Sequence, residues 1–458
     1  MRTFGRRDFL ELASLAAGSA LLPLAARAEA DSAAVTTAHP TFPASDARWQ
    51  RTWDAALGVL AGNIHTLPRF AHPVLVEGSV YPGIWQECAP QEGLVYGTLA
   101  PYIGTPEAGS APLKVARNNH MAFFALQRED GQLPASIKMT DPLENPGGYG
   151  QIQMVVPIAA TAWEISQLTG DDELLVTAYG SCSRWDAWLR EYRDTRKTGL
   201  VEGFCTYDTG HDNSPRWAGI PNRCPDADAR KCPAIATMPR LCPDLSATVY
   251  GGRVALSHMA TALGKPAEAE RWHNDAETIR RLILDRLYDS KDAAFYDLDA
   301  QNNFVRVRSD VISRVFGEHV LNPVKDKAIV DAVWIRQLHN PKAFWAPYPF
   351  TSIAQDDPTF VRPIPRNSWG GASQALTALR APRWMTFYGK QAEMNHMMQQ
   401  WCEAIMRHTE FRQQMDPLTG EFTQADPGGY SPAALVFLDF ARRLNGGSVK
   451  TASTAQQA

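Results

Sequence analysis

The sequence has no excess of basic residues and few long apolar runs. Its 45 Lys and Arg stand against 49 Asp and Glu, which gives a net charge of −4 over 458 residues. Proteins that bind nucleic acids or anionic membranes neutralise phosphates with basic residues, so the composition argues against both classes. The mean hydropathy of −0.28 excludes a protein with many membrane spans. Hydrophobic residues make up 45% of the chain, which is enough for a large buried core.

The N-terminus carries the pattern of an export signal. Arg6 and Arg7 precede an apolar run over 9–24 that is shorter than a typical membrane span. Ala26-Arg27-Ala28 then has the small-x-small pattern of a cleavage site. Paired arginines followed by x-Phe-Leu resemble a twin-arginine signal. An ordinary secretory signal and an uncleaved anchor are the alternatives.

This pattern divides the chain into segments. We interpret 1–28 as a twin-arginine-type signal peptide, 29–45 as a flexible lead-in, 46–445 as the folded domain and 446–458 as a disordered tail. We expect a periplasmic or secreted bacterial protein with no membrane span after cleavage.

Cysteine is scarce, with seven residues and no C-x-x-C pair. Cys224, Cys232 and Cys242 are separated by seven and nine intervening residues without a companion His, which argues against zinc. Because exported proteins favour disulfides, we expect at least one bridge among these three and Cys205. An odd total leaves at least one thiol free, and Cys402, in a helical pattern, is our candidate for a buried one.

Sustained period-two alternation is also scarce, and apolar residues recur at three- and four-residue steps instead. This spacing predicts helices over 46–63, 150–168, 171–192, 245–263, 267–287, 372–379, 384–408 and 431–444. Residues 294–308 are the best hairpin candidate.

The predicted helices alternate between apolar and amphipathic ones, and long loops rich in Pro, Gly, Trp and Asp separate them. No internal repeat is detectable, which argues against a stacked helical solenoid. The alternation predicts an all-α toroid of about a dozen paired helices in an inner and an outer ring, with the functional loops gathered at one end.

Two loops concentrate polar groups. Residues 199–217 bring carboxylates, a His, an Arg and a Trp together, and a carboxylic acid desolvated beside Trp can act as a general acid. The alternative there is an Asx-turn at Asp212 and Asn213. Residues 408–430 crowd acid and amide groups, for which a solvated hairpin turn is the alternative.

Three further stretches hold aromatic and polar groups of the kind that line sugar pockets, although core packing would explain any single Trp. They are 80–91 with Trp85 and Glu87, 344–352 with Trp345, and 362–374 with Arg366 and Trp369.

The loop motifs, taken together, resemble a known family. TGHDNSPRW (209–217) is similar to the acid-bearing loop S-G-x-D-x-S-x-R-W of glycoside hydrolase family 63 and its trehalase relatives, and PDLS (243–246) resembles the D-L-N that follows it. FWAPYPFTSIAQDDPTF and RNSW (366–369) resemble the segment that leads to R-G-P-x-W. Residues 411–435 resemble F-x-E-x-Y-N-P-L-T-G followed by F-G-W-S-A-A-x-L.

The resemblance implies an (α/α)6 toroid that hydrolyses glycosidic bonds with inversion, using one carboxyl as acid and another as base. It implies Asp212 as the general acid and Arg216 and Trp217 as residues that shape the sugar subsite. Further substrate-binding candidates in these motifs are Trp85, Glu87, Asn213, Trp345, Arg366, Trp369 and Tyr430.

The base position departs from the family. It falls on Gln413, and an amide cannot take a proton from water at neutral pH. Glu410 or Glu421 is the candidate substitute base.

The leading interpretation is an exported inverting glycoside hydrolase that acts on an oligosaccharide through an α-glycosidic, glucosidase-like bond, with no cofactor and no metal in the site. The alternatives are a non-catalytic sugar-binding protein on the same fold and an inverting phosphorylase, for which phosphate is its own nucleophile.

Overall fold

The structure is a computed structural model that describes residues 40–103, 111–145, 147–423 and 428–446. The signal peptide, most of the lead-in and the tail from residue 447, as predicted from the sequence, lie outside the described residues. Residues 38–448 form one compact unit. Within the described ranges, no helix is both long and apolar enough to cross a membrane.

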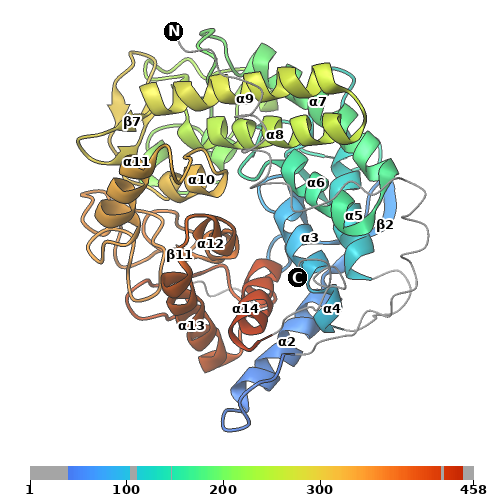
Figure 1. Ribbon diagram of the computed structural model, residues 1–458, viewed down its shortest axis with the longest axis vertical. Helices are drawn as coiled ribbons and strands as arrows, with labels where there is room; N and C mark the ends of the chain where they lie inside the picture. Colours follow the sequence, from blue (N-terminus) through green and yellow to red (C-terminus); the bar gives the residue numbers. More distant parts are fainter. Residues whose placement is uncertain (1–39, 104–110, 146, 424–427, 447–458) are drawn as a thin grey trace, which may run out of the picture. The chain divides into compact units, whose positions relative to one another are not determined.

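Inner and outer helices alternate along the described chain (Figure 1). The inner helices contact one another in the order α3, α6, α8, α10, α12, α14 and back to α3, which closes a ring. Their bounds are α3 (Ala89–Thr98), α6 (Ile158–Thr169), α8 (Pro243–Ala262), α10 (Val311–Gly317), α12 (Ala375–Phe387) and α14 (Ser431–Leu444). The outer helices are α2 (Arg48–Gly62), α5 (Pro112–Ala125), α7 (Asp172–Tyr192), α9 (Pro266–Arg286), α11 (Lys327–Val333) and α13 (Gln391–His408), and the short α4 (Ala100–Ile103) follows α3. This arrangement confirms the predicted (α/α)6 toroid.

The burial of side chains explains why the two rings differ in sequence. The outer helix α9 buries a single stripe, formed by Ala269, Trp272, Ala276, Ile279 and Ile283. The inner helix α14, in contrast, is buried at every position from Ser431 to Ala441. A helix that packs on one side needs one apolar face, whereas a helix surrounded by neighbours is apolar on all sides.

The direction of the helices gathers the functional loops at one end of the ring. Successive helices run antiparallel, so every connection from an outer to an inner helix emerges at the same end. These connections are 63–88, 126–157, 193–242, 287–310, 339–374 and 409–430. The connections from inner to outer helices can be short, as at Gly170 and Asp171, where Gly170 has φ +66° and the Asp171 carboxylate accepts a hydrogen bond from the Leu174 amide.

Short antiparallel strands brace these loops. β3 (Gly83–Trp85) pairs with β4 (Ser136–Lys138), and β11 (Ser373–Gln374) pairs with β12 (Gln414–Met415). The remaining strands are β1 (Ile64–Leu67), β2 (Phe70–Leu75), β5 (Glu202–Gly203), β6 (Arg240–Leu241), β7 (Tyr288–Asp289), β8 (Ala294–Phe295), β9 (Asp297–Leu298) and β10 (Phe304–Val305). β5, β6, β9 and β10 form one four-stranded sheet.

Three predicted boundaries differ from the structure. The helix expected from residue 150 begins at Ile158, because 150–157 runs as an irregular segment along the 193–242 loop. α12 continues through Pro382 and ends before Gly389, which has φ +67°. The hairpin expected over 294–308 is limited to β9 and β10, since β8 pairs with β7 instead.

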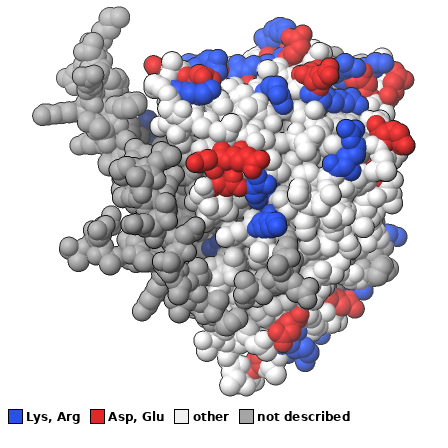
Figure 2. Space-filling view, turned by 90° about the vertical axis from the view of Figure 1, so that its right-hand side faces the viewer, with Lys and Arg blue, Asp and Glu red and all other residues white. Residues whose placement is uncertain are grey.

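The face of the molecule shown in Figure 2 mixes charges of both signs. Acidic and basic side chains lie beside one another along its upper edge, and near its centre an acidic group adjoins basic side chains within otherwise uncharged surface.

Candidate active site

The outer-to-inner loops enclose a cavity of about 350 Å³, which is within the usual size of small-ligand sites. Five connections contribute to it, although their residues are far apart in the sequence. The cavity is lined by Glu77, Val80, Tyr81, Pro82, Trp85, Glu87, Ser136, Lys138, Thr140, Gln151, Gln153, Tyr207, Gly210, Asp212, Arg223, Trp369 and Gln413.

Asp212 has the environment that a general acid needs. Burial raises the pKa of its carboxyl to about 6, although a hydrogen bond from Asn367 Nδ2 to Oδ2 at 3.1 Å opposes the rise. The backbone carbonyl of Asp212 accepts a hydrogen bond from the Trp369 amide at 3.0 Å. A carboxyl with such a pKa carries its proton in weakly acidic solution and can donate it to a leaving oxygen.

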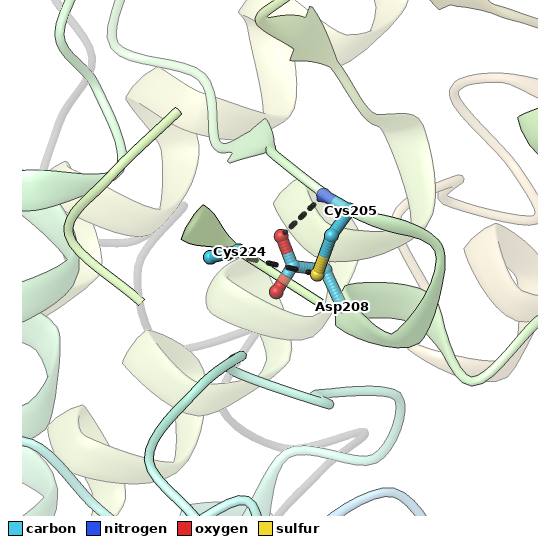
Figure 3. A group of neighbouring side chains, drawn as sticks. All are labelled: Cys205, Asp208 and Cys224. Carbon is cyan, nitrogen blue, oxygen red and sulfur yellow. Dashed lines mark hydrogen bonds between the residues drawn. The ribbon is translucent and has the colours of Figure 1, made fainter. Parts of the chain in front are cut away.

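Asp208 anchors the loop that carries Asp212. Its Oδ2 accepts hydrogen bonds from the amides of Phe204 at 2.7 Å and Cys205 at 3.2 Å, as Figure 3 shows for Cys205. Its Oδ1 accepts one from the Ile152 amide at 2.9 Å, and Arg193 forms an ion pair with the same carboxylate. Because Asp208 and Arg193 are both fully buried, removal of either charge would leave the other unpaired.

His211 holds the same loop from the other side. Its Nδ1 lies 2.9 Å from the Arg216 guanidinium. Because a guanidinium can only donate hydrogen bonds, Nδ1 is the acceptor and Nε2 carries the proton. Nε2 donates this proton to Asp310 Oδ1 at 2.6 Å. Burial and the nearby Arg314 lower the pKa of His211 to about 4. The ring is therefore neutral at neutral pH and acts as a fixed support for its neighbour Asp212.

Arg216 and Trp217 lie beneath the cavity and do not line it. Arg216 is 2% exposed and forms ion pairs with Asp244 at 2.7 Å and Asp297 at 2.6 Å. Trp217 donates from Nε1 to Thr209 Oγ1 at 2.8 Å. Both residues support the 199–217 loop from within the protein and do not line the cavity, which differs from their expected role as substrate contacts.

Gln413 faces Asp212 across a single side chain. Its Nε2 donates to Asn367 Oδ1 at 3.1 Å, and Asn367 in turn donates to Asp212. Its Oε1 accepts from the Tyr81 hydroxyl at 2.8 Å. Asp212 and Gln413, the acid and base positions that the sequence motifs imply, thus line the same cavity.

The structure does not bring Glu410 or Glu421 to the cavity. Glu410 forms an ion pair with Arg412 at 2.6 Å, and its side chain is 44% exposed. Glu421 contacts Arg407 at 3.5 Å and His408 at 3.1 Å. Both carboxylates are stabilised by basic neighbours outside the cavity lining, so neither substitutes for the base in this structure.

The other predicted contacts divide into two groups. Trp85, Glu87 and Trp369 line the cavity. The remainder lie elsewhere: Asn213 is exposed and donates to the Asn367 carbonyl at 2.7 Å, Trp345 packs against Phe350, Arg366 is exposed, and Tyr430 is buried.

Two carboxyl groups other than Asp212 line the cavity. Burial and the nearby Asp212 raise the pKa of Glu87 to about 7, and Gln153 donates to its Oε2 at 3.3 Å. Burial and the charges of Glu92 and Glu87 hold the pKa of Glu77 well above its usual range. Glu77 Oε1 accepts a hydrogen bond from the Tyr430 hydroxyl at 2.7 Å.

Sequence reasoning missed several residues of the site. Glu77 lies outside every motif, and Tyr81 and Asn367 lie inside the stretches 80–91 and 366–369 without having been singled out as site residues. Lys138 and Arg223 also line the cavity, and among the described residues neither forms an ion pair. Two unpaired cations beside an acidic site could be recognised only after folding had brought their loops together.

All seven cysteines are free thiols in this structure. Cys402 is fully buried, as predicted for a free thiol. The sulfurs of Cys205 and Cys224 lie 3.6 Å apart beneath the acid loop (Figure 3), so the disulfide stays a prediction for this pair.

A known domain family matches most of the chain. The family described as mannosylglycerate hydrolase MGH1-like glycoside hydrolase domain matches residues 111–431. Curated protein sequences give no match.

Solved structures share the fold at low sequence identity. The family 63 mannosylglycerate hydrolase of Thermus thermophilus, in complex with Tris and D-glycerate, is 17% identical with a TM-score of 0.66, covering 85% of this chain and 100% of that one. The neutral trehalase of Saccharomyces cerevisiae is 13% identical with a TM-score of 0.59, covering 86% of this chain and 81% of that one. At these identities the likeness shows the (α/α)6 fold.

Proposed function

The chain belongs to the mannosylglycerate hydrolase MGH1-like glycoside hydrolase family and is a glycoside hydrolase, and we propose that it hydrolyses its substrate with inversion of configuration at the anomeric carbon, with Asp212 as the general acid. The observation that carries this proposal is the position of Asp212. Its carboxyl, with a pKa raised to about 6, faces Gln413 across Asn367 in one cavity. Inversion needs this opposed arrangement, because water attacks from the side opposite the leaving group. The Gln413 amide can hold that water by hydrogen bonds but cannot take its proton, so the proton passes to solvent water and the reaction is slower than with a carboxylate there.

Asp212→Asn tests the acid. An amide cannot give up a proton to the leaving oxygen, so turnover should fall by about 10²–10⁴-fold while the melting temperature stays near that of the wild type. Glu410→Gln is the matched control, since Glu410 lies outside the cavity lining, and it should keep full activity. An Asn variant with near-native turnover would remove Asp212 from the mechanism.

The substrate we propose is a small α-glycoside whose leaving part carries a negative charge. Lys138 and Arg223 support it, because both line the cavity without a carboxylate partner among the described residues. Charge-assisted hydrogen bonds from such cations fit a carboxylate. The related Thermus thermophilus enzyme has been crystallised with D-glycerate, which has this chemistry.

A matched pair of substrates tests the charge. Glycosylglycerates and the corresponding glycosylglycerols differ only in the carboxylate, and we expect the glycerates to be preferred. Arg223→Gln should raise KM for the glycerate about tenfold, because a hydrogen bond to a charged group contributes about 1.5–3 kcal/mol. The same substitution should leave KM for the glycosylglycerol unchanged. An equal rise in KM for both substrates would contradict an anionic leaving part.

Phosphorolysis is the second candidate function. Gln413 cannot take a proton from water, whereas phosphate needs no base, and Lys138 and Arg223 could hold phosphate instead of a carboxylate. The assay is product analysis with and without inorganic phosphate. Release of a sugar phosphate that depends on added phosphate would replace hydrolysis by phosphorolysis.

Export through the twin-arginine route is also proposed, on the pattern of Arg6, Arg7 and the small residues around Arg27. The double substitution Arg6→Lys and Arg7→Lys should retain the protein in the cytoplasm, because paired arginines are the feature that defines this signal. Fractionation of expressing cells decides this, and unchanged export would indicate the ordinary secretory route.

A further inference from the structure

Carboxylate and thiol side chains form a compact buried cluster at the wall of the cavity. Ligand atoms of Glu77, Glu87 and Cys88 all lie within 4.8 Å of one another. Cys88 is the residue before α3, and Glu77 and Glu87 belong to the loop that joins α2 to α3. The three residues therefore converge from one outer-to-inner connection.

Two other clusters of similar composition are already neutralised by arginine. The carboxylate of Asp208, beside Cys205 and Cys224, forms an ion pair with Arg193. The carboxylates of the other cluster, Asp244 and Asp297, both pair with Arg216.

The Glu77 cluster has no such partner among the described residues. Arg380, whose charge lowers the pKa of Glu87, donates to the Glu87 backbone carbonyl at 2.9 Å and forms no ion pair with the carboxylates of the cluster among the described residues.

Glu92 adds a fourth acidic group, and its state is the second observation. Glu92 is 0% exposed, and among the described residues no group outside the cluster donates a hydrogen bond to its carboxylate. It faces the cluster, since its carboxylate contacts the Cys88 thiol. A buried carboxylate with no ion-pair partner is costly, so this arrangement favours either bound protons or a cation.

We propose that Glu77, Glu87 and Cys88, with Glu92 beside them, bind one zinc-class divalent cation. Zinc ligands lie about 2.0–2.3 Å from the ion, so atoms at the observed spacing reach a common ion with small side-chain movements. A thiolate among carboxylates selects zinc over calcium or magnesium, which prefer oxygen ligands. Three protein ligands leave the fourth position of a tetrahedral site open.

The open position would face the cavity, because Glu77 and Glu87 line it together with Asp212. A water molecule or a sugar hydroxyl could occupy it. This site departs from the metal-free site expected from the sequence, and it rests on no property of the proposed reaction.

The first experiment measures zinc itself. Purified full-length protein, freed of metal by a chelator and then dialysed, is titrated with zinc chloride while bound metal and the melting temperature are followed. We expect one zinc ion per chain and a rise in melting temperature, with calcium chloride giving neither. No stoichiometric binding and no thermal shift would overturn the proposal and show that the carboxyl groups carry protons instead.

The second experiment identifies the thiol. Cobalt bound to a thiolate gives sulfur-to-metal charge-transfer absorption in the near ultraviolet, so Co²⁺ reports on Cys88 directly. Cys88→Ser should abolish this band and weaken zinc binding at least tenfold. Cys182→Ser, which replaces another buried cysteine outside the cluster, is the matched control and should retain both.

Two further variants keep the test decisive if Cys88→Ser does not fold. Glu92→Gln should weaken zinc binding but keep the cobalt band at saturating metal. Cys205→Ser should change neither, since Asp208 of that cluster is already paired with Arg193. A cobalt band that disappears in Cys205→Ser, or zinc binding that Glu92→Gln leaves unchanged, would place the ion elsewhere and overturn the proposal.

Discussion

Gly210 lies so close to the Glu87 carboxylate that a β-carbon at position 210 would be 1.8 Å from Glu87 Oε2. Gly210 also has φ +61°, a conformation that side chains other than glycine rarely adopt. The acid loop and the α2–α3 connection therefore meet at a point where only a hydrogen atom fits. Asp212 follows Gly210 by two residues, so this contact limits how closely the carboxylates of Glu87 and Asp212 can approach each other.

Gly210→Ala should consequently reduce activity far more than stability. The added methyl group must displace the Glu87 carboxylate or the acid loop, and we expect at least a tenfold loss in kcat/KM. The control is Gly219→Ala, because Gly219 has φ +76° and no atom within 4 Å of an added β-carbon. Both variants incur a backbone cost of about 1 kcal/mol, so equal activity in the two would show that the contact with Glu87 is unimportant.

The contact between Asn367 and Asp212 predicts a pH effect. The general acid must be protonated, so kcat/KM of the wild type should fall above about pH 6 as Asp212 ionises. The hydrogen bond from Asn367 lowers the pKa of Asp212, so Asn367→Ala should move this limb to higher pH, by about one unit if the bond contributes about 1.4 kcal/mol. Asn213→Ala is the control, because its side chain contacts the Asn367 backbone and not the Asp212 carboxylate. A limb that stays in place or moves to lower pH would contradict this.

Glu318 predicts how stability depends on pH. Burial raises the pKa of its carboxyl from 4.5 to about 7, so the folded state binds this proton more tightly than the unfolded state. The resulting stabilisation is complete below pH 4.5 and is lost as pH rises to about 7. From the size of the shift it amounts to about 3 kcal/mol. Glu318→Gln should therefore melt higher than the wild type at pH 8 but not at pH 4.5, whereas the exposed Glu129→Gln should match the wild type at both.

The distance between Cys205 and Cys224 predicts where a disulfide forms. Their sulfurs lie 3.6 Å apart and need to approach to about 2.05 Å. Oxidised glutathione would take up the two electrons and the two thiol protons and leave as two molecules of reduced glutathione. The bridge would close the loop that carries Asp212, a stabilisation of about 3 kcal/mol for a loop of this size. Peptide mapping without reductant should find this pair linked, and a link through Cys232 or Cys242, or free thiols at all four positions, would contradict it.

The apolar pattern of the sequence predicted the amphipathic helices and missed some helices that are buried on all sides or short. The helices with a clear apolar stripe, such as α7 and α9, were predicted close to their observed bounds. α3 was missed because it is buried at nearly every position and contains Pro90 and Gly93, so it shows no amphipathic period. α5, α10 and α11 were also missed, as was the short α4.

The loop motifs likewise predicted some residues of the site and missed others. The motifs placed Asp212 and Gln413 on one cavity, since motif order determines which loops meet. They did not show that Arg216 and Trp217 point into the protein, because the direction of a side chain depends on its partners, here Asp244 and Asp297. Lys138 and Arg223 lie on separate loops and had no local signal.

Gln413→Glu is the sharpest test of the base position. The carboxylate would stand where the Gln413 amide now accepts a hydrogen bond from Tyr81 and faces Asp212 across Asn367. A carboxylate there can take a proton from water, which an amide cannot, so hydrolysis should rise at least tenfold, within the range of about 10²–10⁴ for general base catalysis.

Two glutamates outside the cavity provide the controls for Gln413→Glu. Glu410→Gln and Glu421→Gln should leave hydrolysis unchanged, because ion pairs hold both carboxylates outside the cavity lining. The rate of Gln413→Glu should not depend on phosphate. If Gln413→Glu instead lowers a phosphate-dependent rate, the new negative charge repels phosphate from the position where it attacks, and the amide at 413 is a requirement of phosphorolysis.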